Sequence, residues 1–92
     1  MVSRNFHAGD AIRWVRELAK RPVVTTEALD AWYTEAQLLW DELKAHPGLL
    51  TEMPHFIGHY LSDADVRYRS PEYASLQEKE LAVALREWEE QS

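Results

Sequence analysis

Three residues that can bind a metal ion recur at four-residue steps in one stretch of the chain: His55, His59 and Asp63. If this stretch is helical, the three side chains lie along one side, because residues four apart are neighbours on a helix surface. Imidazole and carboxylate groups are ligands that zinc and nickel accept. The row therefore predicts a metal site, and it is the sequence's one grouping of residues suited to chemistry.

The same row also fits an ordinary helix surface. At about 100° per residue, both histidines lie away from the expected apolar stripe, and only Asp63 lies at the border of that stripe. Such a row lacks a fourth ligand and the surrounding hydrogen bonds that hold a bound ion. Two interpretations therefore remain: a zinc or nickel site, or exposed histidines beside an aspartate that caps a helix or forms a salt bridge.

Other signatures of catalysis do not occur in the sequence. Gly9, Gly48 and Gly58 are dispersed, so they form no phosphate-binding loop, and no serine lies in the context of a nucleophile elbow. The chain contains no cysteine, which excludes disulfides, thiolate metal sites and cysteine nucleophiles. We therefore expect a non-catalytic protein with no cofactor other than zinc or nickel.

Hydrophobic spacing predicts helix throughout the chain, because apolar residues recur every three or four positions and nowhere alternate as in a strand. Four helices are expected, at about residues 6–20, 26–45, 52–69 and 71–90. Thr25 or Thr26 is expected to cap the second helix, Thr51 the third and Ser70 the fourth. The third helix is expected to kink or break near residues 62–65, where serine and aspartate side chains compete for backbone hydrogen bonds.

Length and connection pattern predict the arrangement of these helices. A chain of 92 residues has room for one core, so residues 1–92 form a single domain. Short connections between four helices favour an antiparallel four-helix bundle. Trp32, Trp40 and Tyr68 follow the apolar stripes and are expected in the core.

Three aliphatic residues lie off these stripes and are expected at the surface: Leu38, Leu76 and Val83. Small bundles often gain stability by pairing through such residues, so a homodimer is one interpretation. The other is that they are scattered exposed aliphatics, which are normal on monomers.

Charge is distributed unevenly along the chain. Residues 1–22 hold five basic and two acidic groups, residues 23–65 hold one and eight, and residues 66–92 hold four and six. The acidic middle contains the candidate partner-binding residues Glu27, Asp30, Glu35 and Asp41. Either these residues complement Arg13, Arg16 and Lys20 within the bundle or its dimer, or they bind a basic protein partner.

The excess of acid argues against nucleic-acid binding, which depends on lysine and arginine replacing phosphate counterions. No stretch has the roughly 20 apolar residues that span a bilayer, and the start lacks the apolar run of a signal peptide, so we expect a cytoplasmic protein without a membrane partner.

Three short pieces resemble the colicin-nuclease immunity proteins, which are small acidic helical inhibitors: His46-Pro47, Ser70-Pro71-Glu72 and Arg86-Glu87-Trp88. The adjacent tyrosine pair followed by proline of that family is absent. The resemblance therefore implies a class of behaviour, the binding of a basic partner, and assigns no residues. The sequence as a whole predicts a small acidic interaction or regulatory module, with a metal-binding helical protein as the alternative.

Overall fold

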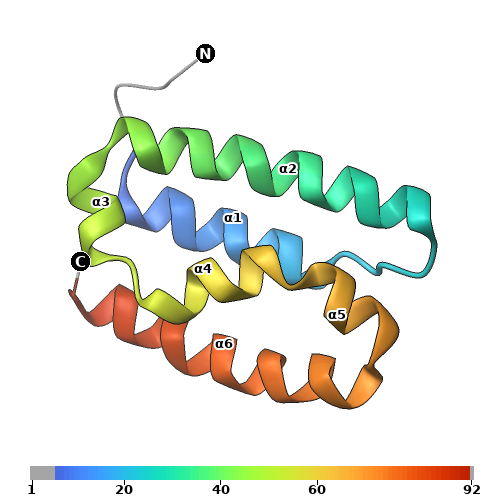
Figure 1. Ribbon diagram of the computed structural model, residues 1–92. Helices are drawn as coiled ribbons and strands as arrows, with labels where there is room; N and C mark the ends of the chain where they lie inside the picture. Colours follow the sequence, from blue (N-terminus) through green and yellow to red (C-terminus); the bar gives the residue numbers. More distant parts are fainter. Residues whose placement is uncertain (1–5, 92) are drawn as a thin grey trace.

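The computed structural model describes residues 6–91, and every regular element in this range is a helix (Figure 1). The helices are α1 (Ala8–Lys20), α2 (Thr26–Ala45), α3 (Pro47–Glu52), α4 (His55–Ser62), α5 (Ala64–Arg69) and α6 (Pro71–Gln91). The predicted all-α bundle is confirmed. In Figure 1, α1 and α4 run in one direction while α2 and α6 run in the other. Within the described range, no helix is long and apolar enough to cross a membrane.

Two short helices, α4 and α5, occupy the range of the helix predicted at residues 52–69, and α3 forms just before it, where a connection was expected. Pro47 starts α3. Proline lacks a backbone N–H, but the N–H groups of the first helical turn have no partner within the helix, so nothing is lost there. Pro54 disfavours helical backbone at Met53, which is extended and ends α3. Thr51 does not cap a helix as expected, because its hydroxyl donates to the Pro47 carbonyl at 2.9 Å. The expected break near residues 62–65 occurs at Asp63.

The starts of α2 and α6 follow the predicted capping chemistry. The Thr25 hydroxyl accepts a hydrogen bond from the Ala28 amide at 3.1 Å at the start of α2. At the start of α6, the Ser70 hydroxyl accepts from the Tyr73 amide at 3.3 Å. Each bond satisfies an amide that the first turn of a helix leaves free.

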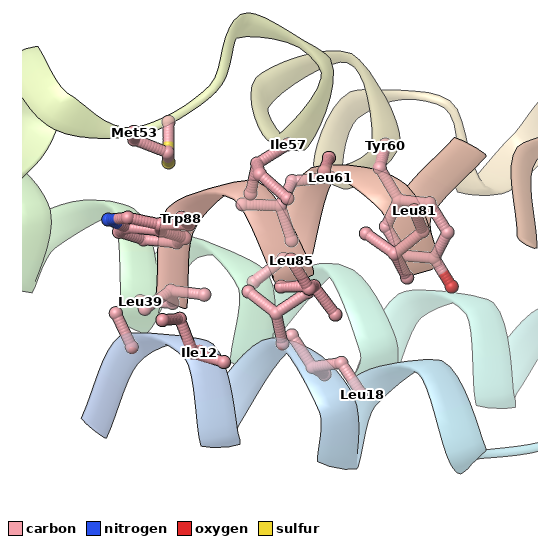
Figure 2. Packing of buried hydrophobic residues seen from close by; sticks show 14 of the residues in the cluster. Ile12, Leu18, Leu39, Met53, Ile57, Tyr60, Leu61, Leu81, Leu85 and Trp88 are labelled. Carbon is pink, nitrogen blue, oxygen red and sulfur yellow. The ribbon is translucent and has the colours of Figure 1, made fainter. Parts of the chain in front are cut away.

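One hydrophobic core joins the helices, and Figure 2 shows its centre. Its most deeply buried side chains are Trp88, Leu18, Leu39, Leu43, Ile57, Leu61 and Val15. Burial stabilises the fold by about 1.5–3 kcal/mol for each large aliphatic side chain. The Trp88 indole nitrogen is fully buried with no hydrogen-bond partner among the described residues, which costs about 1–3 kcal/mol and is offset by packing of the ring.

Of Trp32, Trp40 and Tyr68, which were expected in the core, only Trp32 is fully buried. Trp32 is buried, and its indole N–H donates to the Leu18 carbonyl at 2.9 Å. Trp40 is only partly buried, and Tyr68 is 37% exposed because α5 is a separate short helix with its own orientation. The expected exposure of the aliphatic residues is confirmed at 50% for Leu38, 59% for Leu76 and 56% for Val83.

Candidate functional site

The predicted metal row is divided by the break between α4 and α5. His55 and His59 are exposed on α4, whereas Asp63 ends that helix and is bonded to α6. One carboxylate oxygen of Asp63 accepts from the Tyr73 hydroxyl at 2.9 Å and from the Gln77 amide at 3.2 Å. Among residues 6–91, no group of three or more histidine, aspartate or glutamate side chains is placed to hold a metal ion. Metal binding by this row stays a prediction.

Three of the four predicted acidic residues share one exposed side of α2. Glu27, Asp30 and Asp41 are exposed, and their helical spacing puts them opposite the buried side of α2. Leu38 lies between Asp30 and Asp41 on the same side and is half exposed. We call these four residues the acidic face. In Figure 1, α2 forms one edge of the molecule.

Glu35, the fourth predicted partner-binding residue, does not join this face. One of its carboxylate oxygens accepts from the Trp14 indole N–H at 3.1 Å, and the other lies 3.9 Å from the Arg21 guanidinium. Both contacts link α2 to α1 and to the segment after it. Glu35 is half-buried, unlike the exposed Glu27, Asp30 and Asp41.

The basic residues of α1 do not neutralise the acidic face. Arg13 pairs with Asp10 at 3.7 Å and Lys20 with Glu17 at 3.8 Å, both within α1. Arg16 pairs with Glu89 on α6. Within residues 6–91, no cation forms an ion pair with Glu27, Asp30 or Asp41. Among residues 6–91, the intrachain complementarity considered from the sequence therefore does not occur at these three carboxylates.

A polar network between α4, α5 and α6 was not predicted. Arg67 donates through Nη1 to the Tyr60 carbonyl and to the Gln77 side-chain oxygen, each at 2.6 Å. Gln77, the one buried polar residue in the described range, donates from its amide nitrogen to Asp63 at 3.2 Å and to the Tyr73 hydroxyl at 3.0 Å. The network fixes the break at Asp63 against α6.

Burial and hydrogen bonding alter the acidity of groups in this network. Burial lowers the pKa of the Arg67 guanidinium, because desolvation disfavours its charged form. The hydrogen bond to Asp63 raises the pKa of Tyr73, because the donated proton is held by a carboxylate. The four-residue spacings of Asp63 with Arg67 and of Tyr73 with Gln77 are local signals of this network. Their pairing across helices is not visible in the sequence.

Comparison of the chain with protein-family models, with curated proteins and with solved structures found no match in any of the three.

Proposed function

We propose that this chain is a non-catalytic interaction module that binds a basic protein partner through the acidic face of α2. The observation that carries this proposal is that Glu27, Asp30 and Asp41 share one exposed side of a helix without any ion pair inside residues 6–91. A protein partner is favoured over a nucleic acid because these carboxylates repel phosphate. A cytoplasmic location is part of the proposal.

The composition of the face fits the recognition of a basic surface. Like charges that lie near one another on a helix destabilise it slightly, and cations from a partner relieve that repulsion. Leu38 supplies apolar area between Asp30 and Asp41. Interfaces commonly combine an apolar centre with a charged rim, where charge sets specificity and the rate of association.

Self-association is compatible with this role, because the exposed aliphatics are divided between two helices. Leu76 and Val83 are on α6, at the opposite edge of the molecule from α2 in Figure 1. A homodimer formed through α6 leaves the acidic face free. Homodimerisation stays a prediction.

Affinity capture with matched baits tests the proposal. The baits are the wild type, the double variant Asp30→Lys/Asp41→Lys, and the control Glu72→Lys/Glu90→Lys, which reverses two exposed charges on α6. Circular dichroism first establishes that all three are folded. We expect proteins retained by the wild type and the control to be lost from the α2 variant and released by salt. Retention of the same proteins by all three baits contradicts the proposal.

A further inference from the structure

A pocket of about 290 Å³ lies where the end of α1 meets α5 and α6. Trp32 from α2 and Tyr60 from α4 contribute aromatic walls, and Ala74 lines it from α6. Its charged lining residues are Lys20, Arg21, Arg67 and Glu78. We call it the basic pocket, because three cations and one carboxylate line it in a chain whose formal net charge is −6.

Arg67 is the central group of this pocket. Its guanidinium carbon lies 3.7 Å from the centre of the Tyr60 ring and 5.1 Å from the Trp32 ring. Nη1 makes both of its hydrogen bonds, to the Tyr60 carbonyl and to Gln77. Nε and Nη2 donate to no acceptor within the described residues, and neither is fully buried, so both keep accessible surface.

The positive charge of Arg67 is only partly compensated inside the described part of the chain. No carboxylate of residues 6–91 lies within ion-pair distance of it, and its neighbours are rings, a carbonyl and an amide. Partial burial of a cation costs free energy unless an anion or several acceptors replace the lost water. Cation–π contacts with Tyr60 and Trp32 supply some of this compensation. The Asp63 carboxylate, linked to Arg67 through Gln77, supplies more of it, and an anion in the pocket would add a direct ion pair.

Other charges around the pocket have smaller effects. Lys20 forms a long ion pair with Glu17 at 3.8 Å, and Arg21 forms one with Glu35 at 3.9 Å. Ion pairs near the surface contribute little to stability. The carbonyls at the end of α1 oppose an anion, since they carry the negative end of the helix dipole. One of them, the Leu18 carbonyl, already accepts hydrogen bonds from the Trp32 indole and the Arg21 amide.

We propose that the basic pocket binds a small organic carboxylate with an apolar body, held by the free Nε and Nη2 donors of Arg67. A guanidinium edge with two parallel N–H groups matches the two oxygens of a carboxylate. The apolar body packs against the aromatic lining, in which Tyr68 is the most exposed ring and Trp32 and Tyr60 lie deeper. The pocket volume of about 290 Å³ is at the lower limit for small-molecule pockets, so the ligand must be compact. This binding is independent of the acidic face, so either proposal can fail alone.

Calorimetry with defined probes tests the pocket in the full chain. Benzoate, cyclohexanecarboxylate and hexanoate represent the proposed class, benzamide is the neutral control, and inorganic phosphate tests for a simple anion site. We expect at least one carboxylate to bind saturably at one site, at least about tenfold more tightly than benzamide or phosphate. Failure of all three carboxylates to bind overturns the proposal. Equal binding of benzamide or phosphate overturns the carboxylate assignment.

Three variants test whether the carboxylate binds in the basic pocket. Arg67→Gln removes the cation, Ala74→Leu fills the pocket without changing Arg67, and Arg69→Gln is the control, since Arg69 is exposed on the same helix. We expect the affinity for the best carboxylate to fall at least about tenfold in the first two variants and to stay within about twofold in the control. If Arg67→Gln does not fold, the affinity of Ala74→Leu for the carboxylate tests the proposed site. Unchanged affinity in a folded Ala74→Leu variant overturns the proposal.

Discussion

At the scale of single residues, the indole rings of α2 have different roles. Trp32 is 3% exposed and donates a hydrogen bond to the Leu18 carbonyl, so it joins α2 to the end of α1. Trp40 is partly buried, and its ring lies beside Gly58 on α4, at the edge of the core. The same apolar spacing therefore places one indole in the core and the other at its edge.

Alanine substitution should separate the two rings. We expect Trp32→Ala to lower the free energy of unfolding by about 3–5 kcal/mol, because it leaves a cavity and removes a buried hydrogen bond to the Leu18 carbonyl. Trp40→Ala should cost clearly less, since part of its ring already contacts water. Urea denaturation of both variants measures the difference. Equal losses, or a loss below about 1 kcal/mol for Trp32→Ala, contradict the assigned burial.

The histidine row gives a second prediction at this scale. His55 and His59 are exposed, and the Asp63 oxygen facing α6 already accepts two hydrogen bonds. We expect calorimetry with zinc or nickel near neutral pH to show no binding tighter than about micromolar. A tight stoichiometric isotherm that disappears in His59→Ala, and that weakens as the histidines protonate, contradicts this expectation and supports the metal-binding alternative.

At the scale of elements, a tyrosine on α2 holds the start of α5. The Tyr33 hydroxyl donates toward the Asp65 carboxylate at 2.9 Å and the Ser62 carbonyl at 3.1 Å, and accepts from the Asp65 amide at 3.1 Å. The hydrogen bond from Tyr33 is the main reason that the pKa of Asp65 is lowered. Ionisation of Asp65 therefore strengthens one of the three hydrogen bonds between Tyr33 and this segment.

This contact has a defined pH dependence. A carboxyl group with a lowered folded-state pKa adds stability above its ordinary pKa of about 3.9, and that stability is lost as pH falls through the lower folded value. We expect Tyr33→Phe to destabilise the protein at neutral pH, and the difference from the wild type to shrink below about pH 4. Urea denaturation across pH measures it. Tyr68→Phe is the control, because Tyr68 is exposed on α5 and its hydroxyl forms no hydrogen bond with residues 6–91. A difference between wild type and Tyr33→Phe that is constant with pH contradicts the assignment.

The elements that sequence predicts well are those that local chemistry determines. The bounds of α1, α2 and α6 agree with expectation within about two residues, because each has an apolar stripe and a cap or stop of its own. The predicted third helix breaks at Asp63 as expected, but its start differs because two prolines act in opposite ways. Pro47 starts α3, whereas Pro54 ends it by restricting Met53.

The candidate sites also include residues whose positions follow from local spacing and residues whose positions depend on distant contacts. Three acidic residues of α2 are brought together by spacing within one helix, which a sequence shows directly. Glu35 turns inward because of Trp14 and Arg21, which are distant in sequence. The pairing of Arg67 with Gln77 likewise requires the packing of α5 on α6. Contacts between distant segments set these positions, and a residue pattern contains no information on them.

At the scale of the whole molecule, charge is segregated rather than balanced. The chain has a formal net charge of −6, yet the cations of α1 pair with Asp10, Glu17 and Glu89 and leave the acidic face of α2 without counter-ions from residues 6–91. A face of one sign attracts an oppositely charged partner over roughly 10 Å at ordinary salt. Its main effect is on the rate of association.

The most direct test of the proposed function is the association rate of the purified chain with its captured partner, measured by stopped flow at increasing sodium chloride. We expect the wild-type rate to fall steeply with salt. The Asp30→Lys/Asp41→Lys variant should associate more slowly at low salt and depend less on salt, because steering by the acidic face is lost. The control Glu72→Lys/Glu90→Lys should resemble the wild type. Equal rates and equal salt dependence for the wild type and the α2 variant would contradict binding through the acidic face.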